Sequence, residues 1–387
     1  MRALAITGAV LVALLLAMKL GVGPRIEPGI NRVTPVELPE VSERARSLHF
    51  SSDVVDMHAD SLLFGRDLLE RSEVGHVDLP RLQEGGVAIQ FLTMPTVSHV
   101  GTNADATDPD DFDLLTLMGV VQLNGFAIRS PLGRALIQAE RWRRTIERSE
   151  EQLWPIRDQR ELENLLARHR TDPRTVGTLL GVEGAHALDD DVANFDVLYE
   201  AGVRMIGHTH FFDNAFSGSA HGLDKGGLTE QGRLLLERML EAGVLIDLAH
   251  VSPIAVGQIL DRADVPTVVS HGGVQATCPG PRNLSDDQIR RIAAGGGVIG
   301  VGYFDLAVCG REISHVLAAM QHIAGLVGAA HVALGSDYDG GTNVGFDTSQ
   351  LPALTQALLD AGFSEPEVRG ILGENVLRVL RQVLPEG

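Results

Sequence analysis

Eight apolar, β-rich runs alternate with amphipathic helical segments along most of this chain, and this alternation constrains the fold more than any other feature. The runs lie at residues 54–55, 87–94, 176–182, 203–207, 244–248, 267–270, 298–303 and 331–335. Helical patterns separate most of them, for example at residues 228–242, 285–294 and 313–327. Strands that alternate with helices form parallel sheets, and eight such units predict an α/β fold of the (β/α)8 TIM barrel type.

A doubly wound open sheet is the alternative for the same alternation of strands and helices. That fold usually carries a glycine-rich phosphate-binding turn after its first strand, whereas this chain has His58 and Asp60 at that point. The stretch 98–150 after the second strand is too long for a single connection. We therefore expect a helical insertion there, lying over one end of the barrel as a lid or a dimer surface.

The first 23 residues read as a separate unit. A basic start at residues 1–2 precedes an uncharged, mostly apolar run at residues 3–18, and small residues follow at 21–23. This pattern is typical of a secretory signal peptide or an uncleaved signal anchor, and the poor match to an Ala-x-Ala cleavage site favours the anchor. The leader predicts an extracytoplasmic protein, membrane-anchored in the periplasm or at the cell surface, or secreted if the leader is cleaved.

The rest of the chain divides into two further parts. Residues 24–50 contain prolines and charges, and we expect a linker followed by a short lead-in helix. Residues 51–387 contain all eight strand patterns, so we expect them to form the barrel and to carry the activity. The N-terminal apolar leader would thus join the barrel through this linker and a short helix around residues 41–49.

Charge and cysteine content exclude some functions and leave one question open. The chain has 32 basic and 51 acidic residues, a formal net charge of −19, which argues against a nucleic-acid partner and against a polybasic membrane surface. Its only cysteines are Cys278 and Cys309. Export would permit a disulfide between them, and the alternative is two buried, reduced thiols.

Histidines or acidic residues end six of the eight strand patterns. They are His58 and Asp60 after the first, Glu183 after the third, His208 and His210 after the fourth, His250 after the fifth, His271 after the sixth and Asp337 after the eighth. In (β/α)8 enzymes the chemistry is carried by residues at the C-terminal ends of different strands. One such ending could be a hydrogen-bonded His–Asp pair, but six on one rim predict metal-dependent chemistry.

Five of these residues remain as metal-ligand candidates once His210 and Asp337 are set aside: His58, Asp60, Glu183, His250 and His271. Five are too many for one catalytic zinc, which takes three or four protein ligands, so they predict two Zn²⁺ ions. Glu183 is the natural bridge because a carboxylate offers two oxygens. A water between the two ions would lose a proton near neutral pH and give hydroxide.

Several motifs in this order resemble the membrane (renal-type) dipeptidase family of the metal-dependent amidohydrolase superfamily, from about residue 54 to the C-terminus. They are Asp56-x-His58-x-Asp60, Gly181-Val182-Glu183-Gly184, Gly227-Leu228-Thr229-x-x-Gly232, Leu245-Ile246-Asp247-Leu248-Ala249-His250-Val251-Ser252, Ser270-His271, Pro281-Arg282-Asn283-Leu284 and Gly335-Ser336-Asp337-Tyr338-Asp339-Gly340. The resemblance implies the same five ligands with Glu183 between two zinc ions.

The resemblance also implies roles for three further residues. His210 would polarise the scissile carbonyl, Arg282 would bind the free carboxylate of the substrate, and Asp337 would move a proton from the attacking water to the leaving amine. His208, two residues before His210, could exchange roles with it on sequence alone. The resemblance further implies a Cys278–Cys309 disulfide and a homodimer.

These features together predict a dizinc metallopeptidase that hydrolyses dipeptides with a free C-terminal carboxylate through a metal-bridging hydroxide. The alternative is a related binuclear amidohydrolase that acts on a lactam, lactone or cyclic amide. A non-catalytic binding protein on the same scaffold is a third hypothesis, and it would lack a ligand or Asp337. The chain departs from the family pattern at residues 59–62 and 211–214, which bear on the substrate pocket rather than on the metals.

Overall fold

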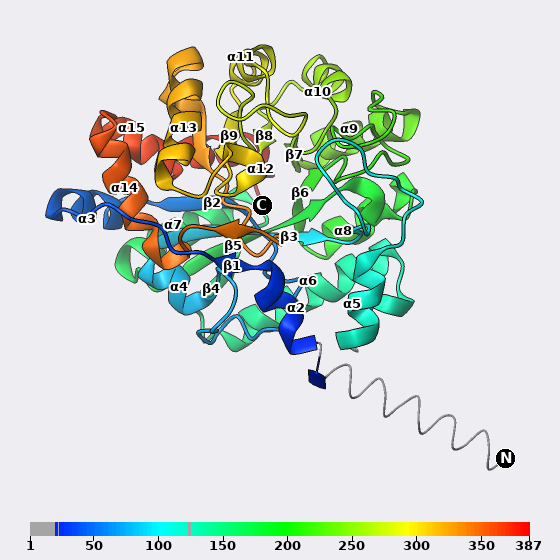
Figure 1. Cartoon of the computed structure of the whole chain (residues 1–387), viewed down its shortest axis with the longest axis horizontal. Helices are drawn as coiled ribbons and strands as arrows, with labels where there is room; N and C mark the ends of the chain where they lie inside the picture. Colours follow the sequence, from blue (N-terminus) through cyan, green and yellow to red (C-terminus); the bar gives the residue numbers. More distant parts are fainter. Residues whose placement is uncertain (1–19, 22, 123–124) are drawn as a thin grey trace.

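The computed structural model describes residues 20–21, 23–122 and 125–387, and it confirms the (β/α)8 barrel (Figure 1). The eight barrel strands are β2 (Val54–Ala59), β3 (Val87–Pro95), β5 (Val176–Glu183), β6 (Val203–Gly207), β7 (Leu245–Asp247), β8 (Val268–Val269), β9 (Val298–Val301) and β10 (Val332–Leu334). All neighbouring pairs are parallel, and β10 pairs with β2 at Leu334 and Asp56, which closes the barrel. Each strand overlaps one predicted run.

A short ninth strand, β4 (Leu153–Pro155), was not predicted. It pairs with the start of β5 through residues 176–178, while β6 pairs with the same strand from Leu180 onward. β5 therefore has β3 along one edge and β4 followed by β6 along the other. Three residues are too few to show a strand period in the sequence.

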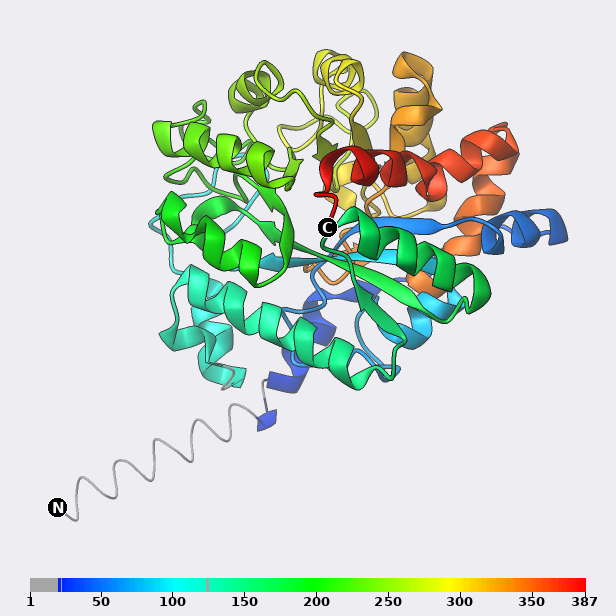
Figure 2. The ribbon, with the colours of Figure 1, turned by 180° about the vertical axis from the view of Figure 1, so that it is seen from behind.

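The barrel is filled by apolar side chains and closed at its N-terminal end by two helices. Val55, Met57, Ile89, Leu179 and Met205 are fully buried in one cluster. The helices α7 (Gln159–Thr171) and α16 (Asn375–Val383) bury leucines in the same cluster and lie together over one end, with the C-terminus at the centre of Figure 2. Only the opposite end, where the strands finish, is left for a site.

Residues 98–150 form the predicted helical insertion, with α5 (Leu114–Gln122), a 3₁₀ turn (Phe126–Ile128) and α6 (Pro131–Arg148). The helix α6 lies against the barrel: Gln138 Nε2 donates to the Pro95 carbonyl at 3.0 Å and Trp142 Nε1 donates to Thr178 Oγ1 at 2.8 Å. The helix α6 thus runs along the barrel wall from the end of β3 to the start of β5. Arg134 near its N-terminus donates to the Thr96 carbonyl at 2.9 Å, just past the end of β3, so the preceding α5 is held at the C-terminal rim.

Residues 23–36, here called the N-terminal strap, cross the same rim. They contain α2 (Gly23–Ile30) and β1 (Arg32–Val33), and β1 pairs in parallel with β11 (Asn343–Val344) in the loop after β10. The Asn31 side chain accepts a hydrogen bond from the Gly341 amide at 2.8 Å. The strap is thus ordered against the loop that begins with Asp337.

Helices outside the barrel wall complete the fold. They are α3 (Glu43–Phe50), α4 (Leu79–Glu84), α8 (Phe195–Glu200), α9 (Glu230–Ala242), α10 (Pro253–Leu260), α11 (Asp286–Ala294), α12 (Asp305–Val308), α13 (Ile313–Val327), α14 (Leu351–Asp360) and α15 (Glu365–Arg369), which a π-helical turn (Gly370–Glu374) joins to α16. The predicted lead-in helix is α3. None of the helices within the described ranges is long and apolar enough to cross a bilayer. The predicted leader at residues 1–23 lies outside those ranges except for residues 20, 21 and 23.

Cys278 and Cys309 form a disulfide with their Cα atoms 5.4 Å apart, closing a loop between residues 31 positions apart. Cys278 lies in the loop after β8 and Cys309 ends α12.

A cross-link of this span removes entropy from the unfolded chain, so we expect the Cys278→Ser/Cys309→Ser double variant to lose about 2–4 kcal/mol of unfolding free energy. Chemical denaturation under non-reducing conditions measures the loss, and wild-type protein treated with a reductant is the matched control. Equal stability of the oxidised wild type and the double variant would contradict this expectation.

Candidate metal centre

The five residues predicted as metal ligands converge on one point at the C-terminal end of the barrel. Glu183, the last residue of β5, lies at the centre. Its Oε1 atom is 3.1 Å from His250 Nε2, 3.4 Å from His271 Nε2 and 3.6 Å from His58 Nε2. Asp60 Oδ1 lies 3.5 Å from His58 Nε2. Side chains from four strand ends therefore share one small volume.

Two triads of side chains in this cluster have the proximity that a metal ion needs. His58, Asp60 and Glu183 form one triad, and Glu183, His250 and His271 form the other. Within each, one ligand atom per residue lies within 4.8 Å of the others. Glu183 belongs to both triads, which is the arrangement that two neighbouring cations with a shared carboxylate require.

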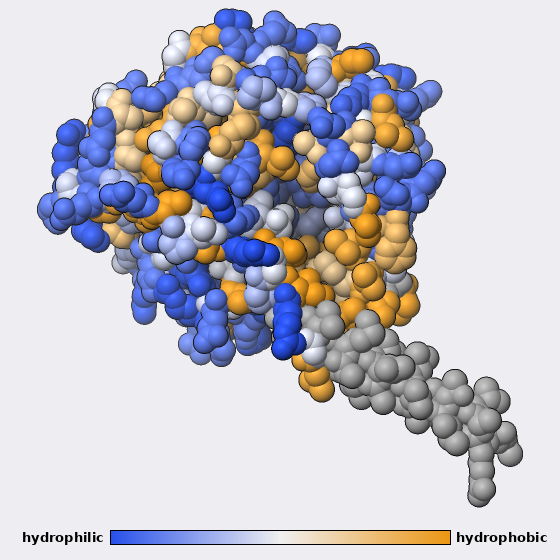
Figure 3. All heavy atoms as spheres, in the orientation of Figure 1, coloured by the Kyte–Doolittle hydropathy of each residue, from blue (hydrophilic) through white to orange (hydrophobic). Residues whose placement is uncertain are grey.

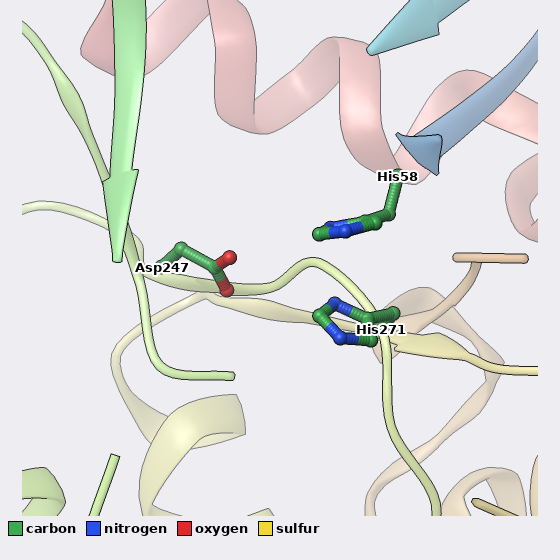
Figure 4. A group of neighbouring side chains, drawn as sticks. All are labelled: His58, Asp247 and His271. Carbon is green, nitrogen blue, oxygen red and sulfur yellow. The ribbon is translucent and has the colours of Figure 1, made fainter. Parts of the chain in front are cut away.

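A third triad, His58, Asp247 and His271, shows how the two imidazoles are oriented (Figure 4). The Ser270 hydroxyl donates to Asp247 Oδ2 at 2.6 Å and lies 3.0 Å from His58 Nδ1 and 2.9 Å from His271 Nδ1. Because the single hydroxyl hydrogen goes to Asp247, both Nδ1 atoms act as donors to the Ser270 oxygen. In the neutral imidazoles each Nε2 would then be unprotonated and would face Glu183, as a metal ligand requires.

Ser270 was not singled out by the sequence, although it stands next to His271 in the Ser-His motif. A second Asp–Ser pair holds the other side of the rim. Ser336 donates its amide to Asp56 Oδ1 at 2.8 Å and its hydroxyl to Asp56 Oδ2 at 2.6 Å, which ties the residue before Asp337 to β2. Asp56 therefore lies on the same strand as His58, but it holds the start of the loop after β10 through hydrogen bonds.

The cluster holds more negative charge than its histidines neutralise. Burial raises the pKa of Glu183 well above its usual value, and the nearby charge of Asp60 raises it further. Burial disfavours the charged form of His58, yet the surrounding carboxylates, Glu183 foremost, raise its pKa to about 10. Without a cation the site retains protons to offset its carboxylates, and a bound cation would replace them.

The three residues to which the resemblance gives catalytic or binding roles border the same cavity. His210 Nε2 is 3.3 Å from Glu183 Oε2. The Asp337 carboxylate lies 3.9 Å from both His58 Nε2 and His271 Nε2. Arg282 is buried, and its Nη2 donates to the His271 carbonyl at 3.2 Å. The cavity has a volume of about 420 Å³, and these three residues line it together with Asp60, Glu183 and His250.

Burial changes the proton affinity of two of these groups. It raises the pKa of Asp337 to about 7, with His58 acting in the opposite direction, and it lowers the pKa of His210 to about 4. His210 is therefore neutral at physiological pH and can donate or accept through its ring nitrogens. An acid with a pKa near the working pH is suited to proton transfer, and a nearby cation would lower that pKa.

His250 and Asp337 also share an uncommon backbone conformation, with φ angles of 63° and 60°. Residues with a Cβ rarely adopt this left-handed region, and when they do the cost is of order 1 kcal/mol or more. Each residue stands three positions after the end of its strand, β7 for His250 and β10 for Asp337, and its side chain lies at the barrel mouth. Strain of this kind is typical of functional sites.

The structure separates His208 from His210, which the sequence alone could not do. His208 is fully buried, and it neither lines the cavity nor joins any of the three triads. His186, just past Glu183, is also buried and packs against Phe212 with ring centroids 4.8 Å apart. Of the three histidines at 186, 208 and 210, His210 is the one whose ring lies against the candidate metal cluster, 3.3 Å from Glu183.

A (β/α)8 barrel that gathers histidines and carboxylates at its C-terminal mouth is the architecture of a metal-dependent hydrolase. The profile of membrane dipeptidase (peptidase family M19) matches residues 42–385, nearly the whole described chain. This chain belongs to that family.

Individual relatives agree with this assignment. The dipeptidase aclJ of Aspergillus oryzae is 32% identical over 221 residues, which cover 54% of this chain and 52% of that relative, so the match spans about half of its length. A metallopeptidase from Rhodobacter sphaeroides, solved with a phosphinate mimic of the dipeptide L-Ala-D-Ala, superposes with a TM-score of 0.70 at 24% identity over 86% of this chain and 99% of the other. The probable dipeptidase PvdM from Pseudomonas aeruginosa gives a TM-score of 0.73 at 19% identity over 89% and 98%. These structural likenesses bear on the fold.

The Ser270 hydroxyl generates a prediction about metal affinity. Ser270→Ala removes the acceptor that fixes both imidazoles, so we expect zinc affinity to fall about 10- to 100-fold. Competition against a chromogenic chelator measures the affinity. The matched control is Ser42→Ala, which removes the N-cap of α3 outside the barrel wall and should cost about 1 kcal/mol of stability without changing zinc affinity. Unchanged zinc affinity in Ser270→Ala would contradict the orienting role.

Proposed function

We propose that this protein is a dizinc metallopeptidase that hydrolyses dipeptides with a free C-terminal carboxylate. The observation that carries the proposal is the position of Glu183, which belongs to both ligand triads at the end of a cavity that Arg282 also borders. Membership of the membrane dipeptidase family supports the reaction class. The dipeptide mimic bound by the Rhodobacter sphaeroides metallopeptidase supports the substrate class.

The donor set fits two zinc ions. His58 and Asp60 would bind one ion, His250 and His271 the other, and Glu183 both. The Nε2 atom of His58 is buried and has no hydrogen-bond partner among the described residues, as expected for a nitrogen reserved for a cation. Zinc ions in such a centre supply a hydroxide near neutral pH and polarise a carbonyl group.

The remaining site residues would bind the substrate and move the proton. Arg282 would hold the terminal carboxylate, because a buried guanidinium offers two parallel donors to it. Neutral His210 would donate a hydrogen bond to the carbonyl oxygen as negative charge develops there. Asp337 would accept the proton of the attacking water and return it to the nitrogen of the leaving amino acid, so that the peptide C–N bond breaks as the amine is released.

The cellular location is part of the proposal. The apolar leader and the disulfide support export, and the family name supports a membrane setting. We infer that the barrel lies outside the cytoplasmic membrane, anchored by its leader or released if the leader is cleaved. A homodimer stays a prediction from the family resemblance.

Asp337→Asn tests the proton-transfer role. The amide keeps the size of the side chain but cannot take up the proton, so we expect kcat for dipeptides to fall about 10²- to 10⁴-fold while the zinc content stays the same. Steady-state kinetics and elemental analysis of the same preparation measure both quantities. The matched control is Asp305→Asn at the mouth of the cavity, which should leave kcat unchanged. Near-normal turnover by Asp337→Asn would remove Asp337 from the mechanism.

Arg282→Met tests the substrate class. Losing the charged hydrogen bonds to the carboxylate should raise KM for a dipeptide about 10- to 100-fold, and the wild-type enzyme should show a similar defect with the matching dipeptide amide. If Arg282→Met instead hydrolyses lactones, lactams or cyclic amides at the wild-type rate and the wild type prefers them to dipeptides, the binuclear amidohydrolase alternative is correct.

A further inference from the structure

The helix α5 is apolar on every face. Its sequence, Leu-Leu-Thr-Leu-Met-Gly-Val-Val-Gln, contains no charged residue. Leu115 and Met118 face inward, and they pack with Leu63, Phe64 and Phe126 in a small core of their own. Leu114 and Leu117 point the other way and are 36% and 43% exposed. A surface helix of a soluble domain normally has a polar outer face. The exposed apolar face of α5 is therefore expected to contact another apolar surface.

Exposed apolar side chains are concentrated around this helix. Of the thirteen large apolar residues exposed in the described parts of the chain, seven lie in two segments at residues 20–30 and 100–128. These seven, here called the apolar rim, are Leu20, Ile30, Val100, Phe112, Leu114, Leu117 and Ile128. Figure 3 shows apolar side chains gathered beside the hollow of the site, on the side where Figure 1, in the same orientation, places α2 and α5.

The two segments form one surface. Ile26 of α2 packs against the small core beneath α5. The amide of Val100 donates to the Phe112 carbonyl at 2.9 Å, which joins the start of the insertion to the residues just before α5. Ile30 and Leu114 also line the cavity of the site. The apolar rim therefore borders the mouth through which a substrate enters.

We propose that the apolar rim docks onto the surface of a lipid bilayer, so that the mouth of the site lies next to the membrane. The argument for lipid is continuity: α2 leads back along the chain into the uncharged apolar run at residues 3–18, whose composition suits a membrane. Contiguous exposed apolar surface of this kind marks an interaction site. The inference does not depend on the proposed peptidase activity.

The charges near the rim define what kind of bilayer it fits. Exposed aspartates at 105, 108, 110 and 111 lie beside Phe112 and outnumber the exposed Arg25 and Arg129 near the rim, and the chain as a whole carries a net charge of −19. Anionic lipids would repel this surface, so apolar insertion rather than basic attraction drives docking. Docking should accordingly be tighter on zwitterionic than on anionic vesicles, and added salt should reduce the difference.

Depth-dependent fluorescence quenching in the full-length protein tests the proposal. The two native cysteines are joined in a disulfide, so one introduced thiol takes the label. The rim variants are Ile128→Cys, 84% exposed, and Leu117→Cys; the control is Phe50→Cys, 46% exposed on α3 at the far side of the barrel. Each is bound to phosphatidylcholine vesicles that contain a nitroxide-labelled lipid. We expect quenching at both rim positions to exceed that at residue 50 by roughly threefold or more.

Three results would overturn the proposal. Equal quenching at the rim and at residue 50, in protein that sediments with the vesicles, means that the bilayer does not touch the rim. If the rim label is shielded from solvent but not quenched by lipid, and the particle has twice the mass of the monomer, a second copy of the chain covers the rim. A shielded label in a monomer means that the chain's own apolar run covers it. Dipeptide hydrolysis measured on the same samples reports the proposed function separately.

Discussion

The negative charge of buried carboxylates at one end of the barrel is the constraint on which the rest of this structure depends. Asp60, Glu183 and Asp337 lie around His58, and all three side chains are largely buried at the base of the cavity. Charges in such a place are tolerated only if they are paired or bind cations. The rise in the pKa of His58 to about 10 lets a protonated imidazole neutralise part of this negative charge. Two divalent cations would neutralise it fully.

Polar residues behind the metal-ligand candidates hold these side chains in place. Asp247 with Ser270, and Asp56 with Ser336, are equivalent devices, because each carboxylate holds both the amide and the hydroxyl of a serine from the next strand end. One orients two imidazoles, and the other fixes the backbone before Asp337. The same two pairs also bind the backbone next to the left-handed residues, because Asp247 accepts from the Ala249 amide and the Ser336 hydroxyl from the Tyr338 amide.

Much of this could be predicted from the sequence, for physical reasons that also set the limit. Apolar runs of parallel strands are buried on both faces, so all eight barrel strands stood out, and their polar final residues had to meet at one mouth. β4 and the β1–β11 pair were missed because two or three residues carry no period. Ser270 was missed because its role depends on His58 and Asp247, two partners that are distant from it in the chain and that only the fold brings to it.

The N-terminal strap lies outside the barrel but is linked to the site by buried polar contacts. Asp339, fully buried two residues after Asp337, accepts hydrogen bonds from Ser61 Oγ and the His76 amide, each at 2.6 Å, and from Arg66. Arg66 also pairs with Glu27 of α2. Burial nonetheless raises the pKa of Glu27 to about 7, against the pull of Arg66.

One polar chain thus runs from the strap, through Arg66 and Asp339, to the loops that carry Asp60 and Asp337. The strap also supplies Ile30 to the apolar rim, and the residues before it in the chain include Leu20 of the rim and the apolar run at residues 3–18. Because hydrogen bonds and ion pairs fix the strap to both loops, the rim and the metal cluster hold a set position relative to each other. A contact made at the rim would therefore fix the orientation of the site mouth as well as hold the protein in place.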